Sequence, residues 1–197
     1  MLNIIIGCTA FVFFNLFDLN KIKFINKLIN LSFAMGIFLI MFATCGLVFG
    51  DYVQRYVPLV AKIIFYLLSF VMMLLLFYAL FGALPFTKTY VKHEAGTDRV
   101  IDTGIYALCR HPGVLFFFFV FLFLWLATGR IVILAACIVW TIMDVIHVFI
   151  QDRFFFPHTL QRYEKYQRNV PFLIPTPGSM KRFFTDVQTQ CRGGRLL

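Results

Sequence analysis

The chain has 197 residues, of which 61% are hydrophobic, including 27 phenylalanines, and only 14% are charged. Soluble domains are nearer half apolar and a quarter charged, so this composition excludes a soluble protein and leaves too little polar sequence for a separate soluble domain. The net charge of +9 does not indicate nucleic acid, because lysines and arginines lie between and after apolar runs, as in cytoplasmic loops of membrane proteins.

Five apolar runs approach the roughly 20 residues that a membrane span needs. They cover residues 2–17, 29–49, 63–85, 112–128 and 131–150. Pro112 suits the first turn of the fourth run, where its missing N–H costs nothing, and Gly129-Arg130 leaves room only for a tight reversal. The sequence therefore predicts an all-α, polytopic membrane protein with about five transmembrane helices and a C-terminal cytoplasmic helical tail.

The distribution of basic residues predicts the orientation of these spans. Fifteen of the 18 lysines and arginines lie in segments 18–28 and 86–111 and after residue 150. The other side carries only Arg55, Lys62 and Arg130. Because cytoplasmic loops carry the excess of basic residues, we expect the N-terminus outside and the C-terminus in the cytoplasm.

Metal binding is not expected. The cysteines Cys8, Cys45, Cys109, Cys137 and Cys191 form no C-x-x-C pair, which also argues against a disulfide framework. The four histidines show no i, i+4 pair of the kind that binds zinc on a helix.

The fifth apolar run contains polar residues that are costly inside a membrane. Asp144, His147 and Gln151 are spaced by three and four residues, so they share one stripe of a helix. The stripe continues into Asp152 and Arg153, which favours a cavity open to the cytoplasm. The alternative is that Asp144 and His147 pair with each other or with a neighbouring helix.

Two polar signatures flank the last apolar hairpin. The first reads Thr-Gly-Ile-Tyr-Ala-Leu-Cys-Arg-His-Pro over residues 103–112, and the second extends from Gln151-Asp152 through two tyrosines to Val170-Pro171. Arg110 and His111 lie at the lip of a span, where they can meet an anionic group. An interfacial arginine that snorkels to lipid headgroups is the competing interpretation.

The ordered pattern T-G-x-Y-x-x-x-R-H-P, a hydrophobic hairpin and Y-x-x-Y-x-x-x-V-P resembles the isoprenylcysteine carboxyl methyltransferase family of integral membrane methyltransferases, to which phospholipid methyltransferases are related. The resemblance covers about residues 98–175. It implies S-adenosylmethionine as cofactor. Together with the apolar runs and the composition of the tail, it divides the chain into three regions. These are transmembrane helices in 1–85, a methyltransferase core of loop, hairpin and post-hairpin helix in 86–175, and a basic flexible tail in 176–197.

Carried over by position, the resemblance implies a set of site residues. The implied cofactor contacts are Asp98, Arg99, Val100, Ile101, Tyr106, His111, Pro112, Gly113, Val114, Gln151 and Asp152. The implied catalytic residues are Arg110 and His147, the latter at the position of a substrate-contacting arginine in some members. Val114 replaces a usual tyrosine, Gln151 and Asp152 replace two glutamates, and Asp98 often corresponds to a histidine.

The chemistry of these residue types suggests roles in methyl transfer. Arg110 or His111 suits the cofactor carboxylate, and Asp98, Gln151 or Asp152 suits its ammonium group or ribose. Tyr106 can pack on the adenine or present its ring to the sulfonium. His147 can orient the acceptor or take its proton, and Asp144, one turn away, can hold the imidazole.

Other functions and several methyl acceptors stay open at this stage. An NADPH-dependent membrane reductase of the sterol type is one alternative, and a non-catalytic protein on the same scaffold is another. The expected partners are the lipid bilayer and a lipophilic or small-molecule methyl acceptor, without nucleic acid or metal. An isoprenylated cysteine, a phospholipid amine, a quinone-like lipid and a small thiol all fit as acceptor.

Overall fold

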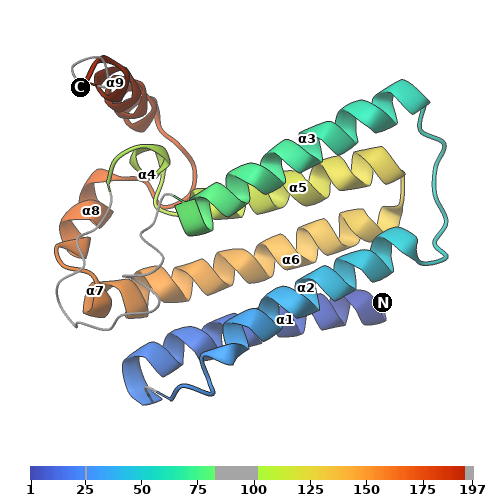
Figure 1. Cartoon of the computed structure of the whole chain (residues 1–197), viewed down its shortest axis with the longest axis horizontal. Coiled ribbons are helices and arrows are strands. Elements are labelled where there is room, and N and C mark those ends of the chain that lie inside the picture. The colour runs from blue at the N-terminus through green and yellow to red at the C-terminus, as the bar shows by residue number, and fades with distance from the viewer. Residues whose placement is uncertain (25, 83–101, 194–197) are drawn as a thin grey trace. The chain divides into compact units, whose positions relative to one another are not determined.

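The computed structural model describes residues 1–24, 26–82 and 102–193. Its long helices are α1 (Leu2–Leu19), α2 (Leu31–Phe49), α3 (Leu59–Phe77), α5 (Pro112–Thr128) and α6 (Ile131–Ile150) (Figure 1). Short π-helical segments extend three of them, namely η1 (Asn20–Phe24) after α1, η2 (Tyr78–Gly82) after α3 and η4 (Gln151–Phe155) after α6. Each of the five expected spans corresponds to one of these helices, so the prediction of an all-α, multi-pass membrane protein is confirmed.

Four helical segments within the described residues have the length and apolar composition to cross a membrane. They are Leu2–Phe24, Leu31–Phe49, Leu59–Phe81 and Ile131–Thr159. Helix α5 is a shorter apolar helix of 17 residues that begins at Pro112, as the sequence predicts. It lies at the short end of the usual range of about 17–25 residues for a span.

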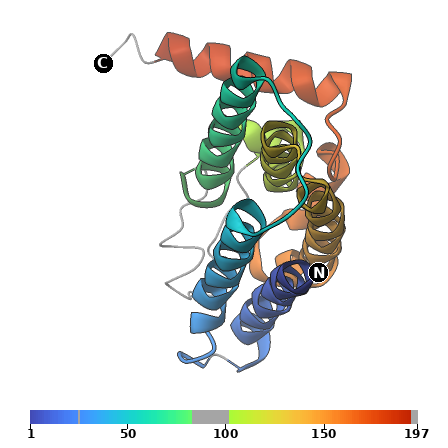
Figure 2. The same cartoon turned by 90° about the vertical axis from the view of Figure 1, so that its right-hand side faces the viewer.

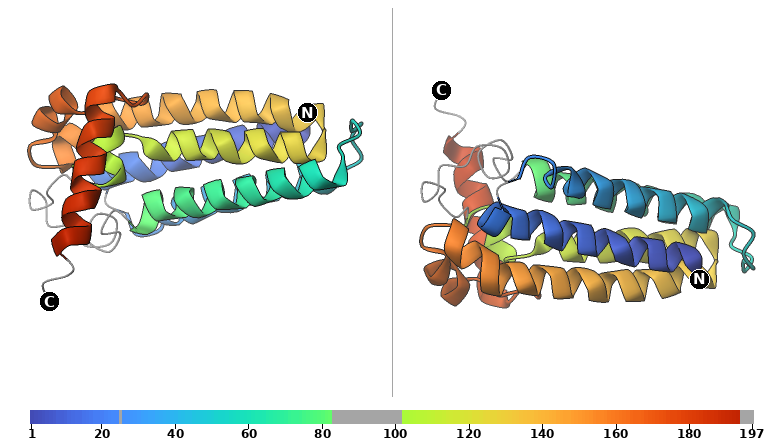
Figure 3. Two further views of the ribbon diagram at one scale, coloured as in Figure 1. Left: turned by 90° about the horizontal axis from the view of Figure 1, so that it is seen from above. Right: turned by 90° about the horizontal axis from the view of Figure 1, so that it is seen from below.

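The chain forms two compact units. Unit 1 comprises residues 1–73 and 117–155, and unit 2 comprises residues 74–116 and 156–197. In unit 1, helices α1, α2 and α6 contact one another (Figure 2). Helix α1 runs antiparallel to α2 and parallel to α6 (Figure 3).

Close contact between α1 and α6 depends on Gly7. A Cβ atom at this position would overlap the ring of Trp140, a residue that is fully buried. The indole N–H of Trp140 donates a hydrogen bond to the Ile4 carbonyl over 2.9 Å, which satisfies the polar end of this large side chain. The glycine and the tryptophan therefore fix the distance between the two helices.

The reversal between α5 and α6 is held by the segment that connects α2 to α3. Gly129 has φ of +67°, a conformation that favours glycine, and a Cβ there would press on the Arg55 carbonyl oxygen at 2.5 Å. The Arg55 amide donates to the Gly129 carbonyl at 3.0 Å, and the Arg130 guanidinium donates to the carbonyls of Leu47 and Gly50. Hydrogen bonds thus connect the expected tight turn to the end of α2 and to the segment that follows it.

Unit 2 contains the short helix α4 (Ile105–Leu108), followed after the hairpin by α7 (Phe156–Thr159), α8 (Tyr163–Asn169) and α9 (Pro177–Gly193). Tyr163 and Tyr166 of α8 and Val170, which follows the helix, form a buried cluster against Phe156 and Leu160. The segment 176–197, expected as a basic flexible tail, contains the helix α9 over residues 177–193.

Candidate functional site

The first polar signature is built around α4 and the residues that follow it in unit 2. The Tyr106 hydroxyl donates a hydrogen bond of 2.8 Å to the Ala79 carbonyl, so the ring is held against η2. Tyr106 itself accepts a 2.8 Å hydrogen bond at its backbone carbonyl from the Tyr166 hydroxyl. The tyrosine from the first signature is therefore tied directly to a tyrosine from the second.

Arg110 joins the same two signatures. Its Nη1 donates to the carbonyls of Gln167 and Val170, both at 2.8 Å, at the C-terminal end of α8. Carbonyls at a helix C-terminus have no partner within the helix and carry partial negative charge, so a guanidinium there satisfies and neutralises them. The guanidinium also lies 5.5 Å from the ring centre of Phe172.

Backbone hydrogen bonds complete the connection. The Arg110 amide donates to the Pro171 carbonyl at 2.9 Å, and the His111 amide donates to the Phe172 carbonyl at 3.2 Å. Residues 110–111 and 171–172 therefore lie side by side. Two segments that are about 60 residues apart in sequence form one structural element at the start of α5.

His111 is buried among aromatic rings, with 7% of its surface exposed. Its imidazole stacks on Phe156 with ring centres 6.0 Å apart and meets Phe172 edge-on at 5.0 Å. Pro112 and Val114 are also buried, whereas a Cβ at Gly113 would make only ordinary contacts with leucine side chains. The structure thus brings Tyr106, Arg110, His111 and their neighbours together within unit 2.

Cys109, between Tyr106 and His111, is fully buried. Burial raises the pKa of its thiol to about 11, although a hydrogen bond with the His111 backbone opposes this effect. Since the thiolate is the nucleophilic form of cysteine, burial and the raised pKa both disfavour reaction at Cys109.

Two expected site residues of the fifth span and its end, His147 and Gln151, belong to a cluster within unit 1. His147 is buried, and its Nε2 lies 3.8 Å from Oδ2 of Asp18, at the end of α1. Gln151 donates a 2.8 Å hydrogen bond from its amide to the same oxygen. We call Asp18, His147 and Gln151 the α1–α6 polar cluster.

Asp18 of α1 is therefore a carboxylate beside His147, so this imidazole pairs with a neighbouring helix, which is one of the two alternatives left open for it. The spacing of Asp144 and His147 along one helix suggested their pairing, but the nearby parallel helix supplies the acid. Asp18 was missed because it follows the first span directly and reads as the start of a polar loop. Its only sequence signal is that it is the single acidic residue before Asp51.

Some of the remaining expected residues lie within the described part of the chain, and others lie outside it. Asp152 is buried at 8% exposure in η4, whereas Arg153 is exposed. Asp98, Arg99, Val100 and Ile101 lie outside the described residues. Within the described part, no group of three or more His, Cys, Asp or Glu side chains is arranged to hold a metal ion.

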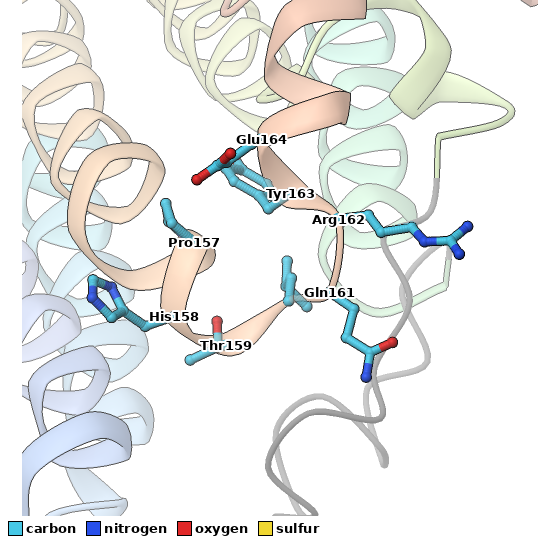
Figure 4. A pocket seen from close by; sticks show the side chains of 8 residues that line it. Pro157, His158, Thr159, Gln161, Arg162, Tyr163 and Glu164 are labelled. Atoms are coloured by element: carbon cyan, nitrogen blue, oxygen red, sulfur yellow. The ribbon is translucent and has the colours of Figure 1, made fainter.

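The turn between α7 and α8 contains an open pocket of about 370 Å³ (Figure 4). It is lined by the consecutive residues 157–164, including Tyr163 and Glu164. Arg162 in this turn has φ of +62°, which is uncommon for a residue with a side chain. A pocket formed by one turn of chain, with none of the expected site residues in its lining, is not the candidate cofactor site.

Comparison with known proteins gives one match. A family model described as phospholipid methyltransferase matches residues 61–165, which is just over half of the chain and extends from α3 to the start of α8. No curated protein and no solved structure matches significantly. The matched range includes the first signature, the hairpin and the first residues of α8, as far as Lys165. It does not include α1.

Proposed function

The chain belongs to the phospholipid methyltransferase family and is a membrane methyltransferase, and on this premise we propose that it uses S-adenosylmethionine to methylate a lipophilic acceptor at the cytoplasmic face. The observation that best supports this proposal is that hydrogen bonds join the two signatures to each other within unit 2. Those signatures are the residues through which the sequence resembles membrane methyltransferases.

The donor set in unit 2 fits S-adenosylmethionine chemically. His111 lies between the rings of Phe156 and Phe172, and Tyr106 adds a third aromatic face nearby in sequence. Aromatic faces attract cations such as a sulfonium and stack on purine rings, and an imidazole suits a carboxylate. When bound, the cofactor supplies an activated methyl group. We propose that His111 and Tyr106 bind it, together with residues 98–101.

Arg110 has a positioning role in this proposal. Its Nη1 is used by two carbonyls of the second signature, so its guanidinium holds residues 170–172 against His111. The cofactor-carboxylate contact expected of Arg110 stays a prediction. Orientation of the binding segment is valuable because correct alignment supplies much of the rate enhancement in methyl transfer.

The α1–α6 polar cluster is proposed to serve the acceptor. A thiol or an ammonium group must lose a proton before its sulfur or nitrogen can attack the methyl group, and His147 can receive that proton at an imidazole nitrogen. The resulting positive charge would be stabilised by Asp18, 3.8 Å away, which Gln151 holds in place. A carboxylate acceptor would need no such base.

The orientation of the protein is part of the proposal. The positive-inside rule places the N-terminus outside and the C-terminus in the cytoplasm. The parallel arrangement of α1 and α6 supports the part of this proposal that puts the two termini on opposite sides, because two parallel spans cross the membrane in the same direction. Residues 110–112 and 151–153 would then both lie at the cytoplasmic end of their helices.

Calorimetric titration of the purified full chain tests the cofactor. We expect saturable binding of S-adenosylhomocysteine, at least a tenfold loss of affinity in His111→Ala, and no binding of NADPH; one lost charge-assisted hydrogen bond is worth about 1.5–3 kcal/mol. His158→Ala, which removes an exposed histidine of α7, is the matched control and should bind normally. Binding of NADPH instead, or equal binding by the His111 variant, would contradict the proposal.

A further inference from the structure

Helix α9 begins with its own cap, independent of the helices that precede it. The Thr176 amide donates to Ser179 Oγ at 2.9 Å, and the Ser179 amide donates to Thr176 Oγ1 at 3.2 Å. Pro177 occupies the first helical position, where its fixed φ favours a helix start. These reciprocal hydrogen bonds make residues 177–193 a defined helix rather than an irregular extension.

The two sides of α9 differ. Ser179 is buried, and α9 contacts α4 within unit 2 (Figure 3). Met180, Phe184 and Val187 are spaced by four and three residues and therefore form one stripe. Their exposed fractions are 45%, 57% and 38%, so this apolar stripe is only partly covered within the described chain.

Basic residues accompany the apolar stripe. Lys181 and Arg182 are exposed in the first turns of α9. Residues 176–197 contain four basic side chains and only one acidic side chain, Asp186. An amphipathic helix with exposed apolar residues and an excess of positive charge has the composition of helices that lie in the headgroup layer of anionic membranes.

We propose that α9 binds the surface of an anionic lipid bilayer, with Met180, Phe184 and Val187 inserted among the upper acyl chains. The apolar helices of this chain already hold it in a bilayer, so a lipid surface is always within reach of α9. Three partly exposed side chains are far too small a patch for a stable protein–protein interface, which needs about 800 Å² from each partner. A lipid surface needs no such area, because the basic residues add electrostatic attraction.

This contact would act on the candidate site through α4. Helix α9 contacts α4, which carries Tyr106, and Tyr106 is hydrogen-bonded to Tyr166 in α8. Binding of α9 to lipid would therefore hold the site residues of unit 2 near the headgroup layer. The lipid-binding proposal stands on the geometry and charge of α9 and does not depend on the reaction.

Hydrogen–deuterium exchange of the full chain in nanodiscs tests the proposal. We expect the amides of α9 to exchange roughly tenfold more slowly when phosphatidylglycerol is mixed with phosphatidylcholine than in phosphatidylcholine alone. Lys181→Gln combined with Arg182→Gln should abolish this difference. Phe184→Gln should speed exchange in both lipids. Lys165→Gln combined with Arg168→Gln, on the exposed side of α8, is the matched control and should keep the difference.

Two results would overturn the proposal. The first is equal exchange in both lipids for the unmodified chain. The second is protection that grows with the number of copies in each nanodisc, because the stripe would then be covered by a second chain. Exchange in α1 and α6 is measured in the same samples, so a variant that fails to fold is recognised and replaced by Met180→Gln, which should repeat the effect of Phe184→Gln.

Discussion

The guanidinium of Arg110 donates hydrogen bonds to two backbone carbonyls of the second signature. Substitution of Arg110 should therefore weaken the contact between the two signatures. We predict that Arg110→Ala costs about 2 kcal/mol of stability, because two carbonyls at the end of α8 lose a charged donor. Arg110→Lys should recover only part of the loss, since an ammonium lacks the planar fork of a guanidinium. Hydrogen exchange in residues 163–172 measures the effect; unchanged exchange in Arg110→Ala would show that the backbone contacts suffice.

Asp18 and His147 should behave as a functional pair. Asp18→Asn removes the charge beside the imidazole while keeping the shape, and we predict a fall in kcat of about 10²-fold if proton transfer limits the rate. S-adenosylhomocysteine affinity should stay within about twofold. Asp18→Glu should restore part of kcat, and Asp51→Asn, at an exposed acid, is the control.

A double-mutant cycle separates this role from a merely structural one. If the two residues act as a unit, combining Asp18→Asn with His147→Gln should lower kcat little more than His147→Gln alone. Multiplicative losses in the double variant would show that Asp18 acts independently of the imidazole. Loss of S-adenosylhomocysteine binding in Asp18→Asn would instead mean that the cluster supports the cofactor.

At the scale of elements, helix contacts depend on small residues whose importance sequence periodicity does not reveal. Gly7→Ala should destabilise the α1–α6 pair by about 1–3 kcal/mol, because its Cβ must displace the buried Trp140 ring. Thermal unfolding of the purified protein measures this change. Combining Gly7→Ala with Trp140→Leu should be less destabilising than the sum of the two single changes. Gly113→Ala, where a Cβ has ordinary contacts, should have little effect.

The helices themselves were predictable because long apolar runs and turn residues are local properties of the sequence. The boundaries of α5 and α6 follow from Pro112 and from Gly129-Arg130, and both agree with the prediction. Helix α9 lies in the part of the helical tail that was expected to be flexible, since a segment rich in Gly, Arg and Gln suggests irregular chain. Its start depends on the hydrogen bonds between Thr176 and Ser179, and its apolar stripe includes only a few residues.

The sequence predicted candidate residues for the site, but it did not predict which groups those residues contact. The motif tyrosines and Arg110 were identified from their order, yet their observed hydrogen bonds go to backbone carbonyls far away in sequence. Side-chain spacing on one helix also suggested Asp144 as the partner of His147, whereas packing brings Asp18 from another helix. Such long-range pairings depend on which helices meet, and one sequence alone does not specify that.

At the scale of the whole molecule, the order of the helices constrains the topology. Helices α1 and α6 are parallel, and α2, α3 and α5 lie between them in the chain. If each of the five helices crosses the bilayer once, α1 and α6 must cross in the same direction. The short helix α5 is the critical case, because a failure of α5 to cross would leave the neighbouring helix α6 antiparallel to α1.

Labelling with a membrane-impermeant maleimide in intact cells tests this topology. We predict that a cysteine at Asp51, between α2 and α3, is labelled from outside, and that a cysteine at Lys165, in α8, is labelled only after lysis. Both positions are exposed, so lysed cells provide the control for reactivity. Labelling of both positions from the same side would mean that one of the apolar helices between them does not cross. Labelling of Lys165 from outside and of Asp51 only after lysis would keep the five crossings but place the candidate site outside the cell. The reason is that Arg110 and His111 are hydrogen-bonded to residues 167–172 and therefore lie on the same side of the bilayer as α8.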